Sequence, residues 1–225
     1  MTDEAQVGRP RAVIVSGAGR YADPWHPFPE TSARIAAVLT SAGFAVEIDE
    51  RVDARLAAPG DADLLVVNVG HPDPAEGAAD AASAAGLLAW ASAGRPLLVA
   101  HVSSTSFPGF PEWEAVLGGI WVRGTTFHPD YGPARIEIVD HAHPITTGIG
   151  DFELRDERYT DLRLGQGLHV LAQHTHEGVA HPLLWAHHYG DARVVYDALG
   201  HDTASYDSPE HRELLRRAAL WLIGR

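Results

Sequence analysis

Cysteine and lysine are both absent from this 225-residue sequence. Without cysteine the chain cannot form disulfides, cysteine-ligated zinc or iron–sulfur sites, or a thiol nucleophile. Without lysine it cannot form a Schiff base or use a P-loop lysine to bind phosphate. Its 17 basic residues, all arginine, face 30 acidic ones, so the formal net charge is −13. This balance argues against a nucleic-acid partner, which would need a basic face.

Long apolar runs are also missing. No run approaches the roughly 20 residues that a membrane-spanning helix needs. The polar N-terminal tail, residues 1–10, lacks the basic start and apolar centre of a signal peptide. We therefore expect a soluble, cytoplasmic protein without a membrane partner. The length fits one α/β domain over residues 1–225, since single domains of this class reach roughly 200–250 residues.

Short apolar segments alternate with helical patterns in the first half of the sequence. Continuous apolar strands separated by helices are typical of a parallel sheet that is covered on both faces. We expect such strands at Ala12–Val15, Phe44–Ile48, Leu64–Val69 and Pro96–Ala100, with helices at Glu30–Ala42 and Glu76–Ala93.

Beyond about residue 120 the connections become short and rich in glycine. Strands with antiparallel or mixed pairing are expected there at Arg135–Val139, Leu168–Ala172, Pro182–Trp185 and Arg193–Asp197. A last helix should begin at Pro209 and end at Ile223, because proline is favoured at the first helical position. The predicted fold is thus an α/β fold with a mostly parallel central sheet and an added mixed-strand region.

Histidine is unusually frequent, with 14 residues. Ligands of open α/β sheets bind at the carboxyl ends of the strands. His26, His71 and His101 follow the first, third and fourth expected strands, so they are candidates for a site. We interpret a second set as surface or structural residues, near loops or on solvated faces: His174, His176, His181, His187, His188 and His211.

Two motifs near strand ends suggest other chemistry. Gly17-Ala18-Gly19 follows the first strand, but prolines delay the next helix, whereas a dinucleotide site needs the helix to open at once. We therefore expect no nucleotide. Ser103 or Ser104, after the fourth strand, could be a nucleophile, but Gly-x-Ser-x-Gly is absent and both fit better as loop hydrogen-bonding residues.

An ordered series of motifs runs along nearly the whole sequence. It consists of Trp25-His26-Pro27, His101, Gly118-Gly119, Phe127-His128, His143-Pro144-Ile145-Thr146, Gly148, Asp156-Glu157-Arg158-Tyr159, Pro182-Leu183-Leu184-Trp185, Tyr189-Gly190-Asp191-Ala192-Arg193-Val194 and Leu199-Gly200-His201. In this order and spacing, from about Arg11 to Trp221, the series resembles the trehalose-utilisation (ThuA-like) family. The turn Val102-Ser103-Ser104-Thr105 departs from that family, which often has glycine or alanine there, so we expect a different pocket shape.

The resemblance implies a fold and a site. The fold would be a flavodoxin-like, class I glutamine amidotransferase-like three-layer sandwich. The activity would be hydrolysis, elimination or isomerisation of a carbohydrate, such as a keto-disaccharide. The candidate catalytic residues are His101, His128 and Glu157, and the candidate substrate-binding residues are Trp25, Trp121, Tyr159 and Arg193.

Imidazole and carboxylate groups together can also bind a divalent ion, most readily zinc. The candidate ligands are His26, His101, His128 and His201. A homodimer is expected. Two alternatives stay open: an amidotransferase-like protein without the catalytic cysteine, and a sugar-binding protein without catalytic activity.

Glutaminase activity should be absent. The glutaminase nucleophile is a thiolate, and no cysteine is available to supply it. We expect no ammonia release from glutamine in a coupled assay. Glutamine turnover that is lost in a Ser103→Ala variant would contradict this prediction.

Overall fold

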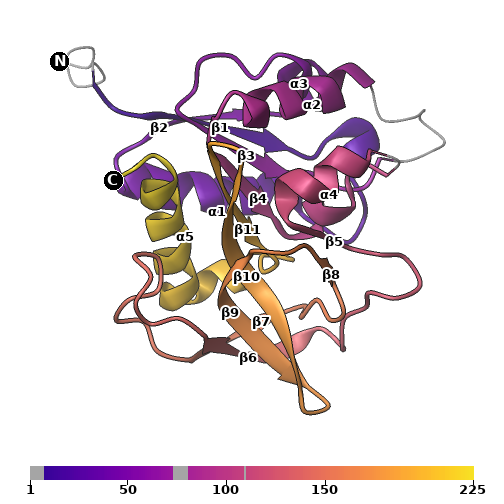
Figure 1. The fold of residues 1–225 in the computed structure, drawn as a ribbon, viewed down its shortest axis with the longest axis vertical. Coiled ribbons are helices and arrows are strands. Elements are labelled where there is room, and N and C mark those ends of the chain that lie inside the picture. The colour runs from indigo at the N-terminus through magenta and orange to yellow at the C-terminus, as the bar shows by residue number, and fades with distance from the viewer. Residues whose placement is uncertain (1–7, 73–80, 109) are drawn as a thin grey trace.

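The computed structural model of the protein describes residues 8–72, 81–108 and 110–225 (Figure 1). Its largest feature is a nine-stranded sheet in the order β2-β1-β3-β4-β11-β10-β9-β6-β7. The bounds of these strands are β1 Arg11–Ser16, β2 Ala45–Asp49, β3 Leu64–Asn68, β4 Leu97–Ala100, β6 Gly132–Ile138, β7 Phe152–Asp156, β9 His169–His176, β10 Val179–Tyr189 and β11 Ala192–Asp197. A separate pair consists of β5 (Gly119–Ile120) and β8 (Arg163–Leu164).

The strands divide the sheet into two parts. The neighbours from β2 through β11 pair in parallel, which confirms the prediction that the first four strands are parallel neighbours. The pairs from β11 through β10, β9, β6 and β7 are antiparallel. All side chains of β3 and β4 are buried, as expected for strands that are covered on both faces.

Helices cover the sheet in two groups. Helix α1 packs against α5, while α3 packs against both α2 and α4 (Figure 1). Their bounds are α1 Phe28–Ser41, α2 Val52–Ala57, α3 Ala81–Ser92, α4 Pro111–Leu117 and α5 Pro209–Leu222. The last helix begins as predicted, because Ser208 Oγ accepts a hydrogen bond from the His211 main-chain N–H at 3.2 Å and Pro209 occupies the first turn.

Several expected boundaries differ from the structure. Residues 76–80 of the expected helix 76–93 lie outside the described residues. The short helices α2 and α4 and the strand β7 were not predicted. The expected strands at 168–172 and 182–185 are only parts of β9 and β10, which continue as a long hairpin beyond the segments with a continuous apolar pattern. None of the helices in the described ranges is long and apolar enough to cross a membrane.

Some histidines that we expected on solvated faces are buried. His174 and His181 face each other in β9 and β10, and His211 is a buried residue of α5. The His211 ring contacts Asp197 Oδ2 at 2.9 Å through Nε2 and Ser205 Oγ at 3.0 Å through Nδ1. The expected solvated position is therefore wrong for His174 and His181, because polar partners inside the fold allow an imidazole to be buried. His211 lies on the last helix, as expected. His188 is exposed, as expected.

Stability at acidic pH should depend on His174. Burial lowers the pKa of His174 to about 4, below the usual imidazole value near 6.5. The unfolded chain therefore binds more protons in this window, and the free energy of unfolding falls as the pH drops from about 6.5 to about 4, by at most about 1.4 kcal/mol per pH unit.

Urea unfolding measured between pH 7 and pH 5 tests this expectation. The His174→Gln variant should show a weaker loss of stability across that range than the unmodified protein. The matched control is His188→Gln, whose exposed ring should leave the pH dependence unchanged. Equal slopes for the unmodified protein and His174→Gln would contradict the assignment.

Candidate functional site

A cleft of about 850 Å³ opens among the loops that follow the parallel strands. Its lining comes from the β1–α1 loop, from the segment after β4, from residues 121–128 and from the chain that follows β7. Loops at the carboxyl ends of parallel strands meet at one edge of the sheet, which explains why segments so far apart in sequence share one cleft.

His101 occupies the sharp turn directly after β4. Its φ of 42° is unusual for a residue other than glycine, and such a conformation persists only where the surroundings enforce it. The buried ring donates from Nδ1 to the Ala198 carbonyl oxygen at 2.7 Å, and its Nε2 atom lies 3.0 Å from the Tyr159 hydroxyl oxygen. Nε2 therefore faces the site.

His26 is fixed by a neighbouring carboxylate in the β1–α1 loop. Both Asp23 oxygens lie 2.8 Å from His26 Nδ1, and Asp23 Oδ1 also accepts the main-chain N–H groups of Trp25 and His26. The buried Nε2 atom has no hydrogen-bond partner among the described residues. Burial outweighs Asp23 and lowers the pKa of His26, so the ring is neutral at pH 7 with its lone pair on Nε2.

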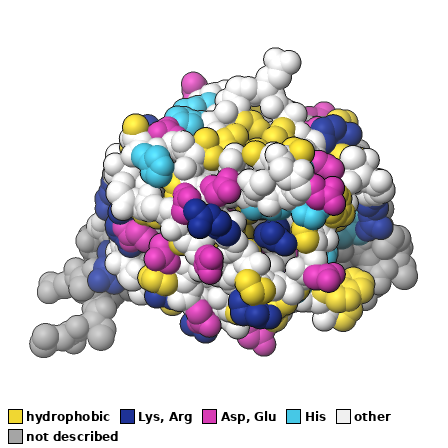
Figure 2. Space-filling view, turned by 90° about the horizontal axis from the view of Figure 1, so that it is seen from below, with side chains coloured by type: hydrophobic (Ala, Val, Ile, Leu, Met, Phe, Trp, Pro, Cys, Tyr) yellow, Lys and Arg dark blue, Asp and Glu magenta, His cyan; other side chains and the backbone are white. Residues whose placement is uncertain are grey.

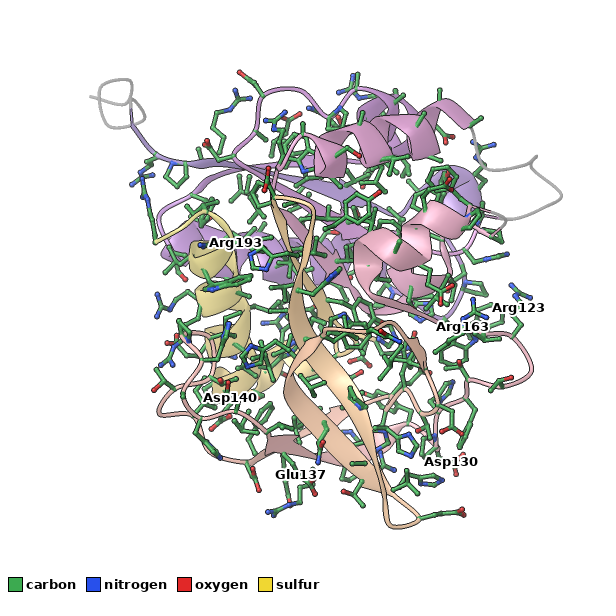
Figure 3. The ribbon with its side chains drawn as sticks, viewed as in Figure 1. Arg123, Asp130, Glu137, Asp140, Arg163 and Arg193 are labelled. Carbon is green, nitrogen blue, oxygen red and sulfur yellow. The ribbon has the colours of Figure 1, made fainter. Side chains whose placement is uncertain are left out.

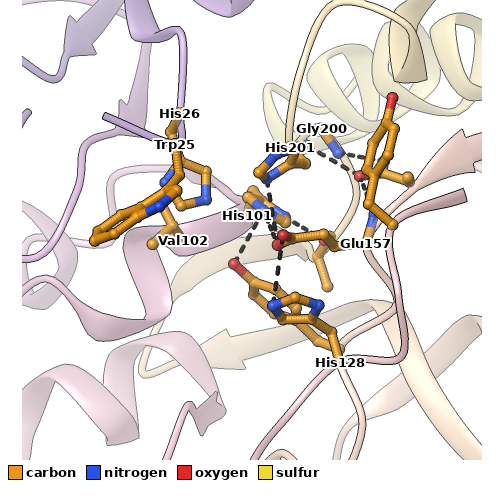
Figure 4. Close-up of polar contacts among 12 residues, drawn as sticks. Trp25, His26, His101, Val102, His128, Glu157, Gly200 and His201 are labelled. Atoms are coloured by element: carbon orange, nitrogen blue, oxygen red, sulfur yellow. Dashed lines mark hydrogen bonds and ion pairs between the residues drawn. The ribbon is translucent and has the colours of Figure 1, made fainter. Parts of the chain in front are cut away.

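Glu157 lies at the centre of the site (Figure 4). Its Oε2 atom is 3.5 Å from His101 Nε2 and 3.2 Å from His201 Nδ1, while Oε1 is 3.4 Å from His128 Nε2. Burial alone would raise the pKa of Glu157, but the hydrogen bonds and charge of His101 and His201 outweigh burial and lower it. Glu157 is therefore ionised at neutral pH.

Asp156 connects the two loops that carry Glu157 and His201. Its fully buried carboxylate accepts main-chain N–H groups of Glu157 at 2.8 Å, Gly200 at 2.7 Å and His201 at 3.1 Å. We did not predict this role from the sequence. The sequence signal for this role is an acidic residue directly before Glu157, at the end of a strand in which buried and exposed residues alternate.

The structure brings together four of the predicted residues. One ligand atom from each of His26, His101, Glu157 and His201 lies within 4.8 Å of the other three. His128 is outside this group and more exposed. Its Nε2 is near Glu157 Oε1, and its ring lies beside those of Trp121 and Tyr159. The spacing of the motifs in the sequence did not distinguish His128 from the three histidines of the group.

These four residues fit a divalent metal ion. His26 Nε2 and His201 Nδ1 are buried without a well-directed hydrogen bond to any described residue, although His201 Nδ1 is close to Glu157. Asp23 and the Ala198 carbonyl bind the opposite nitrogens of His26 and His101, an arrangement that orients ligating imidazoles in metal sites. Three nitrogens and one carboxylate oxygen are a suitable ligand set for zinc.

Aromatic side chains surround the cleft. Tyr159 is buried and stacks on the His101 ring at 4.4 Å between centroids, and Trp121 meets the Tyr159 ring edge-on at 4.6 Å. Trp25 is 71% exposed at the cleft. The hydroxyl of Tyr159 is bonded to His101, so this residue supports the site as well as lining it.

Arg193 does not reach the cleft, so its expected substrate contact is not supported. It lies near the start of β11, where its guanidinium packs over the Trp221 ring of α5 and donates to the Trp221 carbonyl oxygen. Figure 3 shows it beside α5 and away from Arg123. Because β11 runs parallel to β4, the start of β11 lies at the edge of the sheet opposite the cleft.

The serines after β4 are not placed as nucleophiles. Ser103 is fully buried, and its Oγ accepts the Val69 main-chain N–H at 2.9 Å while contacting the carbonyl oxygens of Val67 and Val69. Ser104 is also buried and is bonded to Tyr196. Both serines form hydrogen bonds that fix the segment after β4 to neighbouring parts of the fold, in keeping with the expected hydrogen-bonding role.

Solved structures define the class of fold. A ThuA-like protein from Parabacteroides merdae has a TM-score of 0.80 and 16% identity, and the match covers 96% of this chain and 90% of that one. A glutamine amidotransferase from Thermotoga maritima has a TM-score of 0.59 and 11% identity, with 96% and 99% covered. At such identities the likeness shows the fold alone, which is that of class I glutamine amidotransferase-like proteins.

A family model identifies the sequence more closely. The model described as trehalose utilisation, ThuA, matches residues 11–222. The chain belongs to the ThuA family, which confirms the resemblance seen in the ordered motifs. No curated protein matches the sequence significantly.

Removing the Asp156 carboxylate should destabilise the protein. Asp156→Ala would leave three main-chain N–H groups without their acceptor, one buried and two partly buried, and an unpaired buried group costs about 1–3 kcal/mol. We expect the free energy of unfolding in urea to fall by about 3 kcal/mol or more, with a smaller loss for Asp156→Asn. The control is Asp61→Asn, at a carboxylate whose side chain is 85% exposed. An unchanged midpoint for Asp156→Ala would contradict this role.

Proposed function

We propose that this ThuA-family protein is a metal-dependent enzyme that acts on a carbohydrate, such as a keto-disaccharide. The observation that carries the proposal is the convergence of three imidazoles on one ionised carboxylate, beside a cleft whose lining includes that carboxylate and two tryptophans. Histidine and carboxylate groups in this arrangement serve as metal ligands and as acid–base groups. The family description connects the chain to trehalose utilisation, and so to a sugar.

In this proposal the inner residues hold a divalent ion, most readily zinc. The ligands are His26 Nε2, His101 Nε2, His201 Nδ1 and Glu157 Oε2. A bound ion would supply Lewis acidity for the polarisation of a sugar carbonyl or hydroxyl group.

Glu157 and His128 form the proton-transfer pair. Oε1 of Glu157 faces the exposed His128 ring at 3.4 Å, and both residues line the cleft. A proton taken from the substrate by this oxygen can pass to His128 and then to water. Trp25 and Trp121 bind the apolar faces of the sugar rings, because aromatic rings pack well against such faces.

Elemental analysis of protein purified without a histidine tag tests the metal site. We expect about one equivalent of zinc or another divalent ion per chain, because a four-ligand set of this kind binds a single ion. Glu157→Gln and His26→Gln should lose it, while the exposed His188→Gln should retain it. Metal content should also fall as the pH drops, since ligating imidazoles must be unprotonated.

An assay of keto-trehalose turnover then distinguishes an enzyme from a sugar-binding protein without catalytic activity. We expect turnover that is lost in Glu157→Gln and after chelation. Sugar binding without turnover in the metal-loaded protein would favour the non-catalytic alternative. A protein that binds neither metal nor sugar would contradict the proposal.

A further inference from the structure

Arg123 is a positively charged residue in the cleft lining, and no ion pair joins it to an acidic side chain among the described residues. It is exposed, and within the described parts of the chain it forms no ion pair or hydrogen bond. Arg163, at the same side of the molecule in Figure 3, differs: its guanidinium is bound by both carboxylate oxygens of Glu114 at 2.7 and 2.6 Å. Elsewhere, on the face seen in Figure 2, arginines and carboxylates are interspersed.

The turn that carries Arg123 is held in place at its base. Thr126 Oγ1 accepts the Val122 main-chain N–H at 2.9 Å and donates to the Asp161 carbonyl oxygen at 2.9 Å, and the Thr126 N–H binds the Val122 carbonyl at 2.8 Å. Gly124 allows the turn through its φ of 82°. Fixing the backbone before a ligand arrives reduces the ordering cost of binding.

The acidic groups of the cleft already have partners. Asp23 is bound to His26, and Glu157 is surrounded by His101, His128 and His201. No acidic side chain among the described lining residues is therefore available to neutralise Arg123. In a chain with a net charge of −13, an anionic ligand would be repelled without a local cation.

We infer that Arg123 selects an acidic sugar, one that carries a carboxylate or a phosphate group. The guanidinium presents two N–H groups in a planar fork that matches either anion. The acidic group would bind at this turn while another part of the sugar lies near Glu157. This inference rests on the proposed carbohydrate function and adds the charge of the substrate to it.

Calorimetric titration with three probes tests the inference: glucose, glucuronate and glucose 1-phosphate. Glucuronate or glucose 1-phosphate should bind about tenfold more tightly than glucose. Whichever of the two binds more tightly identifies carboxylate or phosphate as the group that Arg123 recognises. Arg123→Ala should abolish this preference and leave glucose affinity unchanged. Arg123→Lys should retain part of it. Arg163→Ala, which removes a neighbouring arginine that does not line the cleft, should retain all of it.

Salt and simple anions complete the test. Raising the salt concentration should weaken the acidic sugars but not glucose, because ions screen an exposed charge pair. Equal binding of all three sugars, a preference that survives in Arg123→Ala, or inorganic phosphate binding as tightly as glucose 1-phosphate would overturn the inference. If the three sugars bind equally, or if the preference survives in Arg123→Ala, the proposed binding of a carbohydrate is unaffected. If none of the sugars binds, the proposed function fails as well.

Discussion

The buried carboxylate of Asp156 is the interaction on which the geometry of the site depends. It accepts main-chain N–H groups on both sides of the site, from Glu157 after β7 and from Gly200 and His201 after β11. These segments belong to the antiparallel and the parallel parts of the sheet. Because one carboxylate is bonded to both segments, it fixes the position of Glu157 relative to His201.

The parallel half of the fold could be predicted because its signals are local. Strands β1, β3 and β4 are continuous apolar segments, and Ser208 with Pro209 marks the start of α5. The other half depends on pairing between distant segments. In β7 exposed and buried residues alternate over only five positions. β9 and β10 contain polar residues near their ends, so the apolar pattern does not extend over their full lengths. Their partners determine where they begin and end.

For the site, sequence motifs identified His26, His101, Glu157 and His201 but not their supports. Asp23 and Asp156 act through hydrogen bonds whose partners only the fold reveals. Arg193 was misplaced because residue type does not show which end of a strand faces the cleft. The φ of 42° at His101 was not predicted either, because the sequence does not show which residue after β4 adopts a left-handed conformation.

The order of the sheet also has a consequence for self-association. Among the described residues it ends in β2 and β7, and the outer edge of a terminal strand can pair with a further strand. Both carry charge: Glu47 in β2 pairs with Arg55, and Glu153 and Arg155 are exposed along β7. Charged side chains on an edge oppose the addition of another copy's strand. Any stable assembly of this chain should therefore form through its helices or loops, and the sheet should not extend from one molecule to the next.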